Sequence, residues 1–273
     1  MSDHIHVDVD AGVLTLRIAR PDKRNAITQE MYGALAEAFA RAEREDTIRL
    51  IRLGGQGGTF TAGNDLADFL AAGALRTDGP TMTFLRAVAT GTKLLVAEVD
   101  GPAIGIGTTV LLHCDLVYAS ARSVFALPFV PLGVVPEFGS SLLLPRRVGP
   151  AAAARLLYFG EPFDATQASR LGLVTEVLPD ADALRARVDD RIAALLAQPA
   201  QALAATRALL HDSAGPQVLA RIEDEAVQFA RQLESAQTRA AIAARLPGGS
   251  GGRGKPGRSG EPEVPGEPGR SGR

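Results

Sequence analysis

Apolar and polar residues alternate along the first part of the chain. The stretch HIHVDVDAGVLTLRIAR, residues 4–20, places an apolar residue at every second position on both sides of Asp10–Gly12. This period is typical of strands with one buried face, and a short glycine-containing turn is typical of the link between two such strands. The pattern predicts a β-hairpin formed by Ile5–Val9 and Val13–Ile18.

The period then changes to that of a helix. In ITQEMYGALAEAFARAERE, residues 27–45, apolar residues recur every three or four positions, and Thr28 is a candidate N-cap. The next strand is IRLIRLGG, residues 48–55. Residues 94–120 predict a strand, a Gly-Pro turn, a short helix and another strand. Strands that alternate with helices predict an α/β fold around a mainly parallel sheet.

From Gly149 onward the pattern is mostly helical. Asp164 is a candidate N-cap and Gly172 a candidate C-terminal stop, and residues 173–178 (LVTEVL) predict one short strand. These patterns predict an α/β core at 1–200 and a helical region at 201–247. More than half of residues 248–273 are Gly or Pro, so this tail is predicted to be disordered because it buries too little apolar surface.

Composition narrows the class of protein. The 273 residues are 46% hydrophobic and carry a net charge of −2, which gives no general attraction to nucleic acid or to a membrane surface. No apolar stretch approaches the roughly 20 residues of a membrane helix. One cysteine, Cys114, fits a reducing, cytoplasmic location, and four scattered histidines indicate no metal site.

Two glycine-rich loops each lie between a strand and the start of a helix. They are GGQGGTFTAGNDLADF, residues 54–69, and DGPAIGIGTTVLLHCD, residues 100–115. The first N–H groups of a helix are unpaired and carry partial positive charge, so two such ends can hold a carbonyl oxygen and stabilise an enolate. The alternative is that the glycines only permit tight turns.

Glu137 is the only acid between Asp115 and Glu161, in the apolar stretch PLGVVPEFGSSLLLPRR at residues 131–147. An unpaired carboxylate in apolar surroundings is costly and has a raised pKa, which is tolerated mainly where the group performs chemistry. The alternative is that Glu137 caps the helix that follows it.

Together these motifs resemble the crotonase family, the enoyl-CoA hydratase/isomerase superfamily. The stretches that carry the resemblance are RPDKRNAIT (20–28), GGTFTAGNDLADF (57–69), GPAIGIGTTVLLHCDLVYAS (101–120), LPFVPLGVVPEFGSSLLLPRRVG (127–149) and FDATQASRLGLVTEVLP (163–179). The resemblance covers residues 5 to 245. It implies a crotonase/ClpP-like spiral of ββα repeats, a C-terminal helical trimerisation region, a homotrimer or a hexamer, and an acyl-CoA substrate.

The resemblance also implies roles for individual residues. The thioester oxygen would accept hydrogen bonds from the backbone N–H groups of Asn64 and Ile106. Ala62 would contact the adenine through its carbonyl, and Lys23 and Arg24 would bind CoA phosphates unless they form only a solvated basic pair. The residues expected to line the substrate pocket are Asp65, Leu66, Thr109, Phe129 and Leu132. Asp65 is also expected to start a helix, His113 to pack in the core, and Tyr158 and Phe159 to fill apolar space.

Departures from the family pattern decide which reaction is expected. Hydratases of this family use two glutamates, and this sequence has Thr109 and Phe129 at those positions. Glu137 stands where 3,2-enoyl-CoA isomerases of the peroxisomal type keep their single glutamate. The resemblance therefore implies transfer of a proton from C2 to C4 of a 3-enoyl-CoA without metal or redox cofactor. The alternatives are another acyl-CoA reaction (hydratase, hydrolase or dehalogenase) and an inactive acyl-CoA-binding protein.

Overall fold

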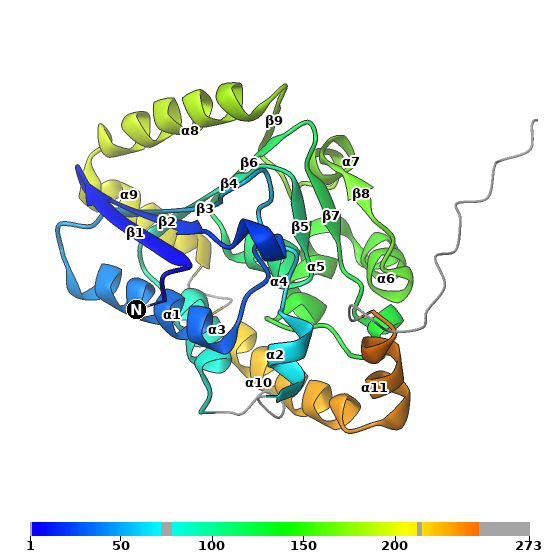
Figure 1. The fold of residues 1–273 in the computed structure, drawn as a ribbon. Coiled ribbons are helices and arrows are strands. Elements are labelled where there is room, and N and C mark those ends of the chain that lie inside the picture. Colours follow the sequence, from blue (N-terminus) through cyan, green and yellow to red (C-terminus); the bar gives the residue numbers. More distant parts are fainter. Residues whose placement is uncertain (1, 72–77, 212–214, 246–273) are drawn as a thin grey trace, which may run out of the picture.

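The computed structural model describes residues 2–71, 78–211 and 215–245 (Figure 1). The tail predicted at 248–273 lies outside these residues. The family resemblance also implies that the acyl chain runs along the segment after Asp65, residues 66–84, and part of that segment, 72–77, likewise lies outside them. Within the described ranges, no helix combines the length and apolar character needed to cross a bilayer.

Two sheets organise the fold. The larger has the order β1-β2-β3-β4-β6-β9 and the smaller the order β5-β7-β8. β1 and β2 form the antiparallel edge of the larger sheet, whose other neighbours are parallel. The strands are β1 Ile5–Asp10, β2 Val13–Ile18, β3 Leu50–Gly55, β4 Leu94–Val99, β5 Pro102–Ile104, β6 Leu116–Ser120, β7 Val124–Ala126, β8 Phe163–Asp164 and β9 Glu176–Leu178. The predicted α/β class with a mainly parallel sheet is confirmed.

Helices cover both faces of the larger sheet (Figure 1). They are α1 Gln29–Arg44, α2 Leu66–Ala71, α3 Pro80–Thr90, α4 Ile106–Thr109, α5 Ser140–Val148, α6 Pro150–Phe159, α7 Ala165–Arg170, α8 Ala181–Leu196, α9 Ala200–His211, α10 Gly215–Leu233 and α11 Ala236–Ala243. α1 packs on α3 in the main core, whereas α8 covers the opposite face through Leu184, Val188 and Ile192. Burial on both faces explains why the central strands are almost continuously apolar.

Local signals placed several elements correctly. The hairpin pairs Ile5 with Ile18 and Asp10 with Val13, as the alternation predicts. The Thr28 hydroxyl accepts a hydrogen bond from the Met31 N–H at the start of α1. Asp164 caps α7 in the same way, by accepting a hydrogen bond from the Gln167 N–H. Such caps satisfy N–H groups that have no partner inside the helix.

Two predictions need correction. The strand expected at 173–178 is only Glu176–Leu178, because the N–H groups of Leu173 and Val174 donate to the Ala168 carbonyl and close the end of α7. Tyr158 and Phe159 do not fill apolar space. Their exposed fractions are 66% and 63%, because they occupy the last turn of α6 on its outer side.

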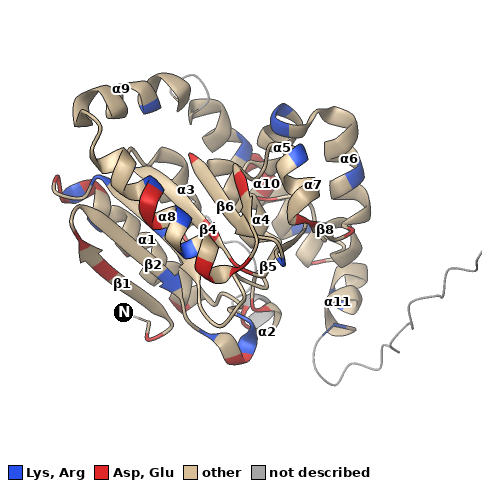
Figure 2. Cartoon of the chain, turned by 90° about the horizontal axis from the view of Figure 1, so that it is seen from above, with Lys and Arg blue, Asp and Glu red and all other residues tan. Residues whose placement is uncertain are grey.

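Charged segments of both signs are interspersed over the elements rather than gathered by sign (Figure 2). α8 illustrates this, because acids and arginines alternate along its sequence. A cluster of charged side chains lies on the larger sheet. In it, Glu98 of β4 pairs with Arg17 of β2 and with Arg52 of β3. This cluster therefore ties three neighbouring strands together.

Candidate active site

The two glycine-rich loops meet at one cavity of about 660 Å³. Asn64, from the first loop, and Ile106, from the second, both lie on its wall. The residues before them, Gly63 and Gly105, have φ angles of +92° and +57°, which side chains other than glycine rarely adopt. The first loop is fixed to Ile27, whose N–H donates to the Gly63 carbonyl at 2.9 Å. Glycine at these two positions is therefore needed for the backbone path that brings the loops together.

Two backbone N–H groups on this wall have no backbone acceptor among the described residues. Among the described residues, neither the Asn64 N–H nor the Ile106 N–H donates to a backbone carbonyl. The amides that precede them are paired: Gly63 donates to the Thr61 hydroxyl at 3.1 Å, and Gly105 donates to the Ala126 carbonyl at 2.9 Å. Unpaired backbone donors in a protein interior are rare because they cost free energy, so these two are candidate donors to a ligand oxygen.

The rest of the cavity lining includes apolar and basic side chains. Apolar lining comes from Leu66, Phe129 and Leu132, as predicted, and also from Phe229 and Ile242 of the C-terminal helices. The contribution of α10 and α11 was not predicted, because nothing in their sequence indicates which surface they contact. An apolar pocket with few polar groups is typical of small-molecule sites.

Four cationic side chains line the same cavity: Arg20, Lys23, Arg24 and Arg245. Ala62 also lies on this wall, and its N–H donates to the Arg24 carbonyl. Arg20 is engaged by Asp65 at 2.7 Å. Lys23, Arg24 and Ala62 are therefore brought together where the resemblance places CoA contacts, and Arg245 is an addition that sequence reasoning missed.

Asp65 is a helix-start residue, as expected. Its carboxylate accepts hydrogen bonds from the N–H groups of Ala67 and Asp68 at the beginning of α2. Burial raises the pKa of the Asp65 carboxyl, but the hydrogen bonds from Arg20 and from the Asp68 backbone hold it below the ordinary value. Asp65 is therefore a paired, ionised group, which does not suit it to act as a general base.

Glu137 has the opposite environment. It is only 4% exposed, and its Oε1 accepts a 2.6 Å hydrogen bond from the Thr109 hydroxyl. Burial raises the pKa of the Glu137 carboxyl to about 8, with a smaller raising contribution from Glu225, while the Thr109 hydrogen bond opposes both. A carboxyl that titrates near neutrality can both remove and return a proton.

The interpretation of Glu137 as a helix cap is wrong, because Glu225 of α10 caps α5. Its two carboxylate oxygens accept hydrogen bonds from the N–H groups of Gly139, at 2.6 Å, and Ser141, at 2.8 Å. The sequence contains a weak signal for this role of Glu225. Glu225 follows Ile222 by three positions and precedes Ala226 and Phe229, so it lies on the buried face of an amphipathic helix.

Thr109 does not lie on the cavity wall, which corrects its predicted place in the substrate pocket. It is fully buried on α4, one turn after Ile106, and its hydroxyl oxygen is 3.4 Å from the Ile106 carbonyl oxygen. Glu137 is not on that wall either. Thr109 nevertheless connects Glu137 to the cavity wall. Its hydroxyl contacts the Glu137 carboxyl, and it lies in the same helical turn as Ile106, which lines the cavity.

Tyr32 of α1 is a site residue that sequence reasoning missed. Its hydroxyl donates to Oδ1 of Asn64 at 2.5 Å. Burial raises the pKa of Tyr32 well above its ordinary value, and the charge of Glu137 raises it further. Tyr32 therefore contacts Asn64 and lies near enough to Glu137 for the charge of that acid to affect it. A tyrosine on the apolar face of α1 is indistinguishable from core in the sequence, so no local signal indicates this role.

His113 packs in the core, as expected. Its ring stacks on Phe138 with centroids 4.1 Å apart, and its Nε2 is 2.8 Å from the Phe138 carbonyl oxygen. Burial lowers the pKa of His113 to about 4, so the ring is neutral at physiological pH. Phe138 itself has a φ of +62°, which places its backbone in the left-handed region directly after Glu137.

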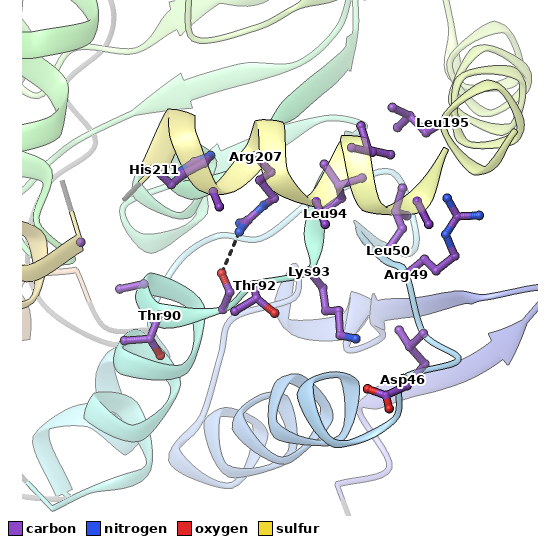
Figure 3. Close-up of a pocket in the computed structure, with 18 of the residues that line it drawn as sticks. Asp46, Arg49, Leu50, Thr90, Thr92, Lys93, Leu94, Leu195, Arg207 and His211 are labelled. Carbon is purple, nitrogen blue, oxygen red and sulfur yellow. Dashed lines mark hydrogen bonds between the residues drawn. The ribbon is translucent and has the colours of Figure 1, made fainter. Parts of the chain in front are cut away.

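A second cavity, of about 610 Å³, lies under α9 (Figure 3) and is lined by none of the predicted site residues. Two of its arginines are already engaged. Arg207 donates to Asp115 at 2.9 Å and to the Gly91 carbonyl at 2.8 Å, and Arg49 donates to the carbonyls of Leu196 and Gln198. These bonds hold α9 and the end of α8 to the sheet. The cavity between Asn64 and Ile106 is therefore the better candidate.

Metal ligation finds no support within the described part of the chain, where no group of three or more His, Cys, Asp or Glu side chains is placed to hold an ion. The chemistry available at the site is therefore that of Glu137, the two unpaired N–H groups and the basic side chains of the cavity.

The chain is similar to proteins of known structure and to curated relatives. A structure of OdaA from Pseudomonas aeruginosa superposes with a TM-score of 0.87 at 38% identity, covering 89% of this chain and 98% of that one. Enoyl-CoA delta isomerase 2 of Rattus norvegicus is 38% identical over 66% of this chain and 47% of its own length, so this chain corresponds to about half of that relative. A probable enoyl-CoA hydratase of Rhodobacter capsulatus is 32% identical over 90% of this chain and 96% of its own length.

These similarities confirm the crotonase-like α/β fold that the motifs predict. Residues 8–245 match the family model described as enoyl-CoA hydratase/isomerase, which is almost the whole of the described chain. By sequence and by fold, the chain belongs to the enoyl-CoA hydratase/isomerase family.

Proposed function

We propose that the protein is an isomerase that converts a 3-enoyl-CoA into the 2-trans-enoyl-CoA. The observation that carries the proposal is Glu137, a buried acid with a raised pKa that is hydrogen-bonded to Thr109, one turn after Ile106 on the cavity wall. Its carboxylate removes the C2 proton, and the resulting dienolate places charge on the thioester oxygen. Hydrogen bonds from the Asn64 and Ile106 N–H groups stabilise that oxygen, and the Glu137 acid then protonates C4.

Absence of a second free acid favours isomerisation over hydration. Addition of water needs one group to activate the water and another to protonate the substrate carbon. Thr109 and Phe129 cannot fill these roles, and Glu225, the acid that most affects Glu137, is engaged at the start of α5. Asp65 is paired with Arg20. Among the described residues, Glu137 is thus the acid available for proton transfer.

The remaining expectations follow from the same proposal. The CoA phosphates bind at Lys23 and Arg24, the adenine contacts the Ala62 carbonyl, and the acyl chain lies along Leu66, Phe129 and Leu132. The reaction needs no metal or redox cofactor, because the double bond only changes position. As the family resemblance implies, we expect a homotrimer or a dimer of trimers. Light scattering would measure the mass of the assembly.

An assay with two arms tests the proposal. The purified protein is incubated with 3-enoyl-CoA esters of several chain lengths, and formation of the conjugated 2-enoyl thioester is followed by absorbance. In parallel, 2-enoyl-CoA esters are supplied and 3-hydroxyacyl-CoA is measured. We expect isomerisation with little or no hydration. Rapid hydration, or turnover of neither ester, would contradict the proposed function.

A further inference from the structure

The Thr109 hydroxyl can donate its single proton to either of two nearby oxygens. Glu137 Oε1 lies at 2.6 Å and the Ile106 carbonyl oxygen at 3.4 Å, so the hydrogen bond to Glu137 is much the stronger. Thr109 is fully buried, and water does not compete for its hydroxyl. This bond therefore fixes one specific oxygen of the Glu137 carboxyl.

The titratable groups near Glu137 are committed elsewhere, and the buried Ser140 hydroxyl, three residues further on, makes no hydrogen bond. Tyr32 of α1 donates its proton to Asn64, and Glu225 of α10 uses both oxygens to accept from Gly139 and Ser141. His113 contacts the Phe138 carbonyl. Among the described residues, no group donates a hydrogen bond to Oε2 of Glu137, so this oxygen is left for the substrate.

We infer that Thr109 is a positioning residue that holds Oε1 of Glu137 and reserves Oε2 as the single oxygen that carries the proton in both transfers. This inference rests on the proposed function. In the first transfer the C2–H bond breaks, an O–H bond forms on Oε2, and the electron pair moves into the dienolate. In the second transfer that O–H bond breaks and a C4–H bond forms. Thr109 donates to Oε1 throughout and gains or loses no proton.

A hydroxyl suits this task better than a charged partner. It binds the carboxylate more strongly than the neutral acid, so it favours ionisation, yet it leaves the pKa near neutrality. An arginine at the same place would hold Glu137 ionised, as Arg20 does for Asp65, and would impede the return of the proton. The residue that stands where hydratases keep a glutamate thus has a role of its own in this chain.

The chain offers a matched set of variants. Thr109→Val removes the hydroxyl and keeps the shape, Thr109→Ser restores the hydroxyl, and Thr109→Ala repeats the loss in a smaller side chain in case the valine variant does not fold. Thr108→Val is the control. Thr108 is also buried, but its hydroxyl donates to the carbonyls of Ala103 and Ala126 rather than to an acid.

Two measurements read the result. Infrared difference spectra across a pH titration, with Glu137→Gln as the blank, report the protonated carboxyl of Glu137 without any turnover. The pH dependence of kcat/KM reports the same group during isomerisation. We expect Thr109→Val to raise the apparent pKa of Glu137 by about one unit or more and to lower kcat about tenfold even above that pKa, because the carboxyl is no longer held. Thr109→Ser should restore both values, and Thr108→Val should change neither.

The outcomes separate the inference from the proposed function. If the wild type isomerises and Thr109→Val keeps its titration and its kcat, the inference is wrong and the proposed function stands. If the wild type isomerises no ester, the proposed function fails together with the two-transfer role of Oε2. The infrared titration then still decides whether Thr109 holds the acid.

Discussion

Two glutamates are buried to the same degree, but their surroundings shift their pKa values in opposite directions. Glu98 lies on the sheet at 5% exposure and Glu137 beside Thr109 at 4%. Burial raises the pKa of Glu98, but hydrogen bonds and charge from Arg17 and Arg52 outweigh it and hold the pKa below the ordinary value. Glu137 has one hydroxyl partner, and its pKa rises to about 8. Equal burial therefore gives a permanent charge in one place and a titrating acid in the other.

The largest expected effect is on catalysis. Glu137→Gln should reduce kcat/KM for the 3-enoyl ester about 10³-fold or more, because the amide cannot accept the C2 proton. Glu98→Gln is the comparison variant and should keep kcat/KM per folded molecule. A Glu137→Gln enzyme with wild-type rates would remove Glu137 from the mechanism.

Next in size is the effect of Glu98 on stability. Glu98→Gln removes the carboxylate partner of Arg17 and leaves Arg52 paired only with Asp189. Removal of one partner from a buried ion pair costs about 3–5 kcal/mol. Glu37→Gln is the matched control, because its pair with Arg44 is exposed, and such pairs contribute about 0–1 kcal/mol. Urea denaturation measures both. Similar losses in the two variants would mean that the Glu98 cluster contributes no more than a surface pair.

The two acids should also give opposite dependences of stability on pH. Since folding raises the pKa of Glu137, its contribution is complete below the unfolded value of about 4.3 and is lost as pH rises to about 8. Glu98, with a lowered pKa, contributes above its unfolded value and loses that contribution as pH falls. The stability of Glu137→Gln relative to wild type should therefore increase by up to about 1.4 kcal/mol per pH unit within that window.

Thermal unfolding of the wild type and of Glu137→Gln at several pH values measures this difference. If the difference between them were independent of pH between 5 and 8, the folded pKa of Glu137 would be close to its unfolded one. The contrast with Glu98 would then lose its basis.

The smallest effect is expected from Tyr32→Phe. This variant removes the hydrogen bond to the Asn64 side chain and leaves the packing against Phe84. Loss of one such bond costs about 1 kcal/mol, so kcat should fall by about threefold to tenfold, with KM little changed. A much larger loss would indicate that Tyr32 takes part in proton transfer and is not only a support for Asn64.

The features predicted from the sequence are those that depend on residues close together in the chain. The hairpin, the Thr28 and Asp164 caps, and the burial of Glu137 follow from periodicity and from short-range chemistry. The resemblance of the motifs added the pairing of Asn64 with Ile106 across one cavity. These predictions were possible because each depends on residues close together in the chain or on motifs whose order is specific.

Contacts between distant segments could not be predicted. Glu225 caps α5 from more than 80 residues away, and Tyr32 reaches Asn64 from a helix whose apolar face gives no sign of it. The sequence showed that Thr109 stands where hydratases have a glutamate. It did not show the hydrogen bond from Thr109 to Glu137, which lies 28 residues further along the chain. Such pairs depend on how helices pack, which periodicity does not specify.

One feature of the cavity bears on how the protein is made. The residues Phe229, Leu233, Ile242 and Arg245, from the C-terminal helices and the residues just after them, complete a wall whose other residues come from the first half of the chain. During synthesis, the Asn64 and Ile106 loops leave the ribosome long before these helices do. A chain truncated before α10 would therefore lack this part of the wall, and we expect its cavity to be open on that side.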